Sequence, residues 1–187
     1  PTHGRRGLER FLLGSTSERV VRRADVPVLT IRPDDDVTIS HPYQNVLVPT
    51  DGSNCANQAL AIGVDVADAE DAALHLLSVV AIPTLGADAR PDIRMELLEE
   101  SAHELLDEAA AFADDAGVDA ASTTVEYGPS IHQAILTYID DHDFDLVVVG
   151  THGRTGFDRY VLGSVTEYLV RTSPIPVLTV REPLQET

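Results

Sequence analysis

Lysine is absent from this 187-residue chain: all 13 basic residues are arginine, against 31 acidic residues, for a net charge of −18. So acidic a surface repels a phosphate backbone, which argues against DNA or RNA as a partner. Concentrated salt screens repulsion between like charges, so a lysine-free acidic chain suits a salt-filled cytoplasm. We therefore expect a halophilic, archaeal source, with an ordinary acidic protein as the alternative.

Cysteine is nearly absent too, because Cys55 is the only one in the chain. A single thiol excludes a disulfide framework and a cysteine-based metal site, and we interpret it as a small buried or half-buried helix residue. The seven histidines show no metal-ligand cluster. No apolar run approaches the roughly 18 residues of a membrane span, and no signal peptide is visible. We therefore expect a cytoplasmic protein with no membrane partner.

A glycine-rich segment joins the apolar run 146–149 to a helix-like run at 165–172. Its pattern is Gly150, two residues, Gly153, nine residues, Gly163, and then Ser164. Free backbone N–H groups and the positive end of a helix dipole make such a loop suitable for phosphate. The pattern is neither a Walker A loop, which requires lysine, nor GxGxxG. Turn glycines with positive φ are the alternative interpretation.

The N-terminus repeats this motif. Residues 2–15 match 151–164 at an offset of 149 residues, and the match continues almost to Pro33 with about half of the positions identical. We therefore expect the last piece of a first domain (1–33), an acidic linker (34–42), a complete second copy (43–183) and a tail (184–187). The first residue is Pro1 and not methionine, so we expect a fragment boundary there; a natural protein with a full first domain is the alternative.

Strands and helices alternate through the complete copy. Apolar patterns predict strands at 43–50, 72–80, 120–127, 144–149 and 175–181, and helices at about 53–69, 92–116, 130–141 and 164–173. Such alternation predicts an α/β fold, a doubly wound five-stranded parallel sheet with helices on both faces. The simplest order with a topological switch is 3-2-1-4-5, which places a ligand crevice between the first and fourth strands.

Two helices carry more specific expectations. The long helix 92–116 is predicted to bury one apolar stripe and to end at Gly117, the stripe being Leu98, Ala102, Leu105, Ala109, Phe112 and Ala116. A helix at 16–24 in the first fragment would present an apolar side with no sheet of its own to cover. That fragment carries a glycine loop without the other strands, so we expect no nucleotide site from it alone.

The predicted crevice brings Asp51 and the glycine-rich segment together. Asp51 either binds a ribose or base edge or caps the turn through Gly52 and Ser53. Ser164 starts an S-x-x-E capping box and either caps its helix only or also contacts phosphate. Arg154 and Arg159 have two possible roles, to neutralise phosphates or to pair with Asp158. For His152 and His3 we expect packing in their loops, because no serine, cysteine or carboxylate partner stands at a spacing that suggests catalysis.

These segments resemble the universal stress protein family. The family's ATP-binding pattern, G-x2-G-x9-G-[ST], is met by the glycine-rich segment, and 48–53 (VPTDGS) matches the end of its first strand. The resemblance covers 43–182 as a whole domain and 1–32 as the last quarter of another. It implies an ATP site, with the backbone of Val79 at adenine, formed by Thr50, Asp51, Val79, Gly150, Thr151, His152, Gly153, Arg154, Gly163, Ser164 and Val165.

The resemblance also implies a function. ATP would carry Mg²⁺ or Mn²⁺ on its phosphates, without a protein ligand for the metal, in a regulatory stress-response module. We expect little or no turnover, because no residue is an obvious catalyst of hydrolysis. A nucleotide-free dimerisation module is the alternative. A nucleotide-dependent ligase is a weaker third reading, since it needs a catalytic base, a lysine or a second substrate domain.

Members of the family dimerise through the edge of the fifth strand. The resemblance therefore implies antiparallel pairing of two edge segments, within one chain or between the chains of a homodimer: Pro27, Val28, Leu29, Thr30 and Ile31 with Pro176, Val177, Leu178, Thr179 and Val180. Such pairing would cover an exposed apolar edge.

Overall fold

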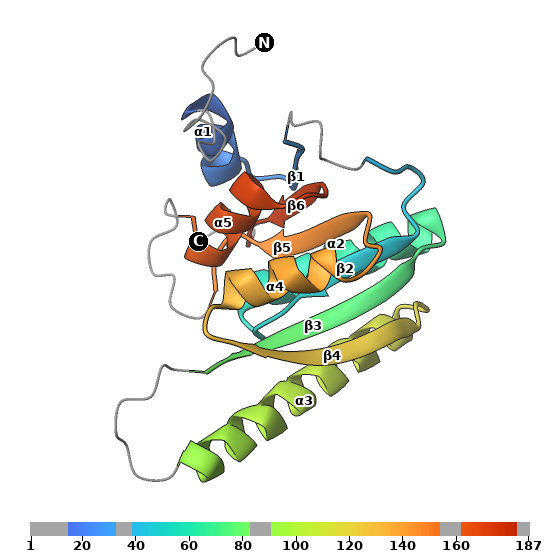
Figure 1. Ribbon diagram of the computed structural model, residues 1–187. Helices are drawn as coiled ribbons and strands as arrows, with labels where there is room; N and C mark the ends of the chain where they lie inside the picture. The colour runs from blue at the N-terminus through green and yellow to red at the C-terminus, as the bar shows by residue number, and fades with distance from the viewer. Residues whose placement is uncertain (1–14, 33–38, 83–90, 154–161, 183–187) are drawn as a thin grey trace, which may run out of the picture.

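The computed structural model describes residues 15–32, 39–82, 91–153 and 162–182. A single sheet lies between helices on its two faces (Figure 1). In chain order the elements are α1 (Ser15–Arg23), β1 (Val28–Thr30), β2 (Asn45–Pro49), α2 (Asn54–Glu70), β3 (Ala73–Ala81), α3 (Pro91–Asp115), β4 (Ala120–Gly128), α4 (Ile131–Asp140), β5 (Leu146–Gly150), α5 (Ser164–Thr172) and β6 (Val177–Val180). No described helix is long and apolar enough to cross a membrane.

The sheet has six strands in the order β1-β6-β5-β2-β3-β4. Neighbours from β6 to β4 are parallel, whereas β1 is antiparallel to β6. The expected five-stranded, wholly parallel sheet of order 3-2-1-4-5 is corrected to a six-stranded mixed sheet, because the N-terminal segment adds the antiparallel β1 beyond the row β4-β3-β2-β5-β6. The chain starts its domain at β2, which pairs with β3 on one side and β5 on the other, so the carboxyl ends of these three strands meet at one edge of the sheet.

Two apolar clusters cover the two faces of the sheet. Along β2 the side chains alternate, so Val46 and Val48 belong to the cluster with α2 and α3, and Leu47 belongs to the cluster with α4 and α5. All three are 0% exposed. A strand buried on both faces reads as a continuous apolar run, which explains why this strand was predictable from the sequence.

The core face of α3 differs from the predicted stripe. Its fully buried residues are Ala102, Leu106, Ala109 and Ala113, whereas Phe112 is 47% exposed and Ala116 is also exposed. Leu98 and Leu105 line a crevice at the end of the sheet instead of the core. The predicted and observed faces share Ala102 and Ala109, and the physical reason for the difference is the rotation of α3 about its axis, which turns the side with Leu106 and Ala113 toward the sheet. Gly117 ends the helix as predicted, with φ of 88°.

The N-terminal segment is a structural copy of the last helix and strand. Glu18 and Arg22 form an ion pair of 2.6 Å in α1, and Glu167 and Arg171 form the same pair at 2.6 Å in α5. The apolar side of α1 is only partly uncovered, because Val21 is 2% exposed while Val20 is 48% exposed. The helix expected at 16–24 thus buries one of these two neighbouring valines and leaves the other exposed.

The two copies meet with local twofold symmetry. Leu29 of β1 lies opposite Leu178 of β6, and these residues are equivalent at the offset of 149. Around them the hydroxyl of Thr30 donates to the carbonyl of Val177 at 3.0 Å, and the hydroxyl of Thr179 donates to the carbonyl of Val28 at 3.2 Å. The structure thus joins the two edge segments within one chain.

An arginine extends this junction. Arg32, just past β1, donates from Nη1 to the carbonyl of Thr172 at 2.6 Å, at the last residue of α5. A cation at a helix C-terminus also interacts favourably with the helix dipole. The junction therefore ties β1 both to the edge of β6 and to the helix that leads into it.

We predict that Thr179→Val weakens this junction. The substitution keeps the buried volume but removes a hydrogen bond, which costs about 1 kcal/mol and lowers the Tm by about 2–4 °C for a chain of this size. Thermal unfolding followed by circular dichroism measures it, with Thr123→Val on the exposed side of β4 as control. Equal Tm values for Thr179→Val and the wild type would contradict the role of the paired hydroxyls.

Candidate functional site

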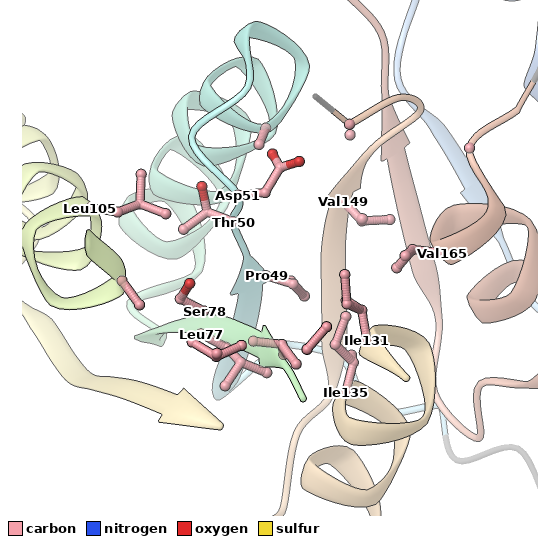
Figure 2. Close-up of a pocket in the computed structure, with 18 of the residues that line it drawn as sticks. Pro49, Thr50, Asp51, Leu77, Ser78, Leu105, Ile131, Ile135, Val149 and Val165 are labelled. Atoms are coloured by element: carbon pink, nitrogen blue, oxygen red, sulfur yellow. The ribbon is translucent and has the colours of Figure 1, made fainter. Parts of the chain in front are cut away.

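A crevice of about 580 Å³ opens where the carboxyl ends of β2, β3 and β5 meet. This volume is in the range of small-molecule sites. Figure 2 shows Thr50 and Asp51 on one side of it and Val149 and Val165 on the other. The crevice therefore lies at the topological switch between β2 and β5, where doubly wound sheets bind ligands.

Gly150, the last residue of β5, is held from both faces of the sheet. The hydroxyl of Thr166 in α5 donates to its carbonyl at 2.6 Å. On the other face, a Cβ added to Gly150 would lie 2.8 Å from the backbone carbonyl atoms of Cys55 in α2. Gly150 does not have a positive φ. Its lack of a side chain is thus required by the close approach of a helix, which neither interpretation of the sequence anticipated.

Cys55 and Thr151 lie below the crevice. Cys55 is 6% exposed, and its Sγ donates to the carbonyl of Val180 at 3.2 Å and lies 3.5 Å from the hydroxyl of Thr151. The prediction of a buried helix cysteine is confirmed. Thr151 is 1% exposed and does not line the crevice, and its hydroxyl lies 3.0 Å from Nδ1 of His152. Thr151 therefore supports the loop from beneath.

Asp51 closes the turn after β2. Its Oδ1 accepts a hydrogen bond from the backbone N–H of Ser53 at 3.0 Å, and Gly52 has φ of 74°. Ser53 then caps α2, with its hydroxyl accepting from the N–H of Ala56 at 3.3 Å. A Cβ on Gly153 would lie 2.8 Å from Oδ2 of Asp51. Asp51 thus holds the turn with one oxygen and packs against the glycine-rich segment with the other.

The start of α5 differs from the predicted capping box. The N-cap is Gly163 and not Ser164, and no side chain caps the helix. Glu167 pairs with Arg171 instead of reaching back to the cap. The N–H of Gly163 donates to the carbonyl of Thr151 at 2.8 Å, which turns the chain so that the exposed Ser164 is the first helical residue. The first turn of α5 therefore faces the crevice without a side-chain cap.

Most of the predicted site residues come together here. Those that line the crevice are Thr50, Asp51, Val79, Gly150, His152, Gly153, Gly163, Ser164 and Val165. Thr151 is beneath it, and Arg154, like Arg159, Asp158 and His3, lies outside the described residues.

Sequence reasoning missed one wall of the crevice and part of its floor. These residues come from β2, β3, α3 and α4: Pro49, Leu77, Ser78, Leu98, Ser101, Ala102, Leu105, Ile131 and Ile135. The available signal was Ser78, a polar residue inside an otherwise apolar strand. The α3 residues gave no such signal, because their spacing fits a core stripe equally well.

The lining divides the crevice into two chemically different ends. The end at the glycine-rich segment offers backbone groups and the N-terminus of α5, and the end at β3, α3 and α4 is mainly apolar. Among the described lining residues, Asp51 is the only carboxylate. The described residues contain no group of three or more potential metal ligands. This arrangement suits a molecule with one anionic end and one flat apolar end.

Fold and site define a doubly wound α/β protein with a ligand crevice at its switch point. The chain belongs to the universal stress protein family, whose model matches residues 1–32 and 42–181. A universal stress protein of Methanocaldococcus jannaschii is 32% identical over 147 residues, covering 77% of this chain and 85% of that relative. One from Mycobacterium tuberculosis is 31% identical over 179 residues, covering 96% of this chain but 59% of the relative.

Solved structures are similar over the same region. UspA from Lactobacillus plantarum has a TM-score of 0.69 at 29% identity, covering 76% of this chain and 100% of that one. A universal stress protein crystallised in complex with cAMP has a TM-score of 0.60 at 27% identity, and the match covers 74% of this chain and 97% of that one. A protein from Archaeoglobus fulgidus, with a TM-score of 0.66 at 26% identity, is matched over 95% of this chain and 60% of its own length.

We predict that Gly150→Ala destabilises the protein. The new Cβ would overlap backbone atoms of α2 that cannot rotate away, and such overpacking costs about 1–3 kcal/mol, or a Tm lower by about 2–10 °C. Gly128→Ala is the control, because its Cβ would meet the Cβ of Ala134 at 3.3 Å. If differential scanning calorimetry gives the two variants the same Tm, the close approach at Gly150 is not a constraint.

Proposed function

We propose that this protein binds ATP in the crevice and acts as a regulatory stress-response module with little or no turnover. The observation that supports the proposal is that one crevice contains both the N-terminus of α5, which has no side-chain cap, and an apolar slot at β3, two strands away from β5 in the sheet. Each feature alone is common, but together they fit the two ends of a nucleotide.

The phosphates would lie against the start of α5. Gly153 and Gly163 line the crevice there, Ser164 adds an exposed hydroxyl, and the N-cap Gly163 makes no side-chain hydrogen bond to the first helical turn. Anions are favoured at such a position by free N–H groups and by the helix dipole. Mg²⁺ or Mn²⁺ would remain on the phosphates and lower their repulsion. It would also limit repulsion from Asp51, the carboxylate in the lining.

The base would lie at β3. The N–H of Thr50 donates to the carbonyl of Leu77 at 2.8 Å, after which the chain turns away at Gly52. Val79, two residues further along β3, lines the crevice, and its backbone is the proposed partner of the base edge. Ile131 and Ile135 of α4 supply apolar surface nearby (Figure 2). The relative crystallised with cAMP supports an adenine nucleotide as the ligand class.

Little turnover is proposed because the lining offers few groups for acid–base chemistry. Among its described residues the ionisable side chains are those of Asp51 and His152. Asp51 accepts from the backbone N–H of Ser53, and Nδ1 of His152 lies 3.0 Å from the hydroxyl of Thr151. Both side chains therefore have structural partners, and a binding role fits them better than general-base catalysis.

The second candidate is a nucleotide-free pairing module, favoured by the symmetric contact of β1 with β6. In that reading the glycines serve packing, as Gly150 does, and the function lies in joining two copies of the domain. Within this chain the edge of β6 is already covered by β1. A homodimer through β6 would therefore require β1 to leave its place.

We predict that Gly163→Val weakens ATP binding by at least about tenfold, because a branched side chain there would press on the loop at Thr151 and Gly153, which lie 3.2 and 3.9 Å from the added Cβ. Calorimetric titration with MgATP in molar KCl measures the change. Gly128→Val is the matched control, since its Cβ has a similar contact outside the crevice. Undiminished affinity in Gly163→Val would leave the pairing module as the better reading.

A further inference from the structure

Ser78 has a hydroxyl that the folded protein does not use. The residue is 6% exposed and lines the crevice. Among the described residues its side chain has no hydrogen-bond partner. The buried side-chain atoms that lack a partner in the described part of the chain are Nε atoms of three arginines, so the oxygen of Ser78 is reached from the crevice and is not sealed in the core. An unpaired hydroxyl that faces a crevice is therefore placed for a partner that comes from outside the chain.

The surroundings of Ser78 are apolar. On β3 its side chain is on the same face as those of Leu76 and Val80, because alternate residues of a strand share a face. Ala102 and Leu105 of α3 line the same end of the crevice. Figure 2 shows its hydroxyl oxygen pointing from β3 into the space bordered by Thr50 and Leu105. The short side chains of Ser78 and Ala102 leave room for a ligand there. A single hydroxyl in an apolar slot can fix the orientation of a flat ligand.

The position of β3 decides which part of a nucleotide reaches Ser78. The glycine-rich segment follows β5, and β2 lies between β5 and β3. Two strand spacings of ~4.8 Å place the two sites about 10 Å apart. Phosphates held at Gly153 and Gly163 are too far to meet the hydroxyl, whereas a base attached through ribose spans that separation.

We propose that the hydroxyl of Ser78 forms a hydrogen bond with the edge of the nucleotide base and contributes to base selectivity. This inference rests on the proposed function. Adenine and guanine carry their donors and acceptors at different positions along their edges, so a hydroxyl held at one point on β3, beside the backbone of Val79, meets a different group in each base.

The test compares Ser78→Ala with Ser101→Ala. Ser101 also lines the crevice, but it is exposed on α3, so its variant controls for loss of a serine at this end. Calorimetry gives the Kd of each protein for MgATP and MgGTP. We expect Ser78→Ala to weaken ATP binding about 3- to 10-fold more than GTP binding, the scale of one hydrogen bond. Ser101→Ala should leave the ratio unchanged.

Thermal unfolding of the ligand-free variants provides a second readout. Because this hydroxyl has no partner within the described part of the chain, Ser78→Ala should leave the Tm of the ligand-free protein equal to that of the wild type within about 1 °C. A clearly lower Tm, or an equal loss of affinity for both nucleotides, would mean a structural role and overturn the inference.

The two proposals can fail separately. If the folded wild type binds neither nucleotide, the proposed function fails and the inference falls with it. If the wild type binds ATP and Ser78→Ala has the same ATP-to-GTP ratio, the inference alone is overturned. Both results come from the same set of titrations.

Discussion

The close contact between Gly150 and the first turn of α2 is the constraint on which the site depends. Thr166 holds the carbonyl of Gly150 at 2.6 Å from one face, while the backbone at Cys55 leaves no room for a Cβ on the other. Interiors packed this closely transmit small displacements. The contact therefore fixes the end of β5 against the start of α2, the helix that follows the turn at Asp51.

The sheet has two distinctive regions, the crevice at the carboxyl ends of its central strands and the outer edge at β6. At the carboxyl ends of β2, β3 and β5 it leaves a crevice with one polar and one apolar end. At the outer edge it repeats α5 and β6 as α1 and β1, and joins them around Leu29 and Leu178. The edge of β6, which would otherwise be open to other chains, is thereby covered by the same chain.

Periodicity and spacing revealed most of this from the sequence, because apolar runs and glycine positions are local signals. The segments around Asp51 and Gly150 were correctly placed together by the topology of doubly wound sheets. Three features were not predictable. The core face of α3 depends on the angle at which it crosses the sheet, the N-cap at Gly163 depends on a bond to Thr151, and the role of Gly150 depends on the distant α2.

A crystal structure with MgATP tests the central claim most directly. Our account predicts one nucleotide per chain, with phosphates beside Gly153, Gly163 and the first turn of α5, and with the base against β3 at Ser78 and Val79. An empty crevice at saturating MgATP, or a nucleotide bound elsewhere, would contradict it. The glycine-rich segment would then be a packing device, and the junction of β1 with β6 would become the main clue to function.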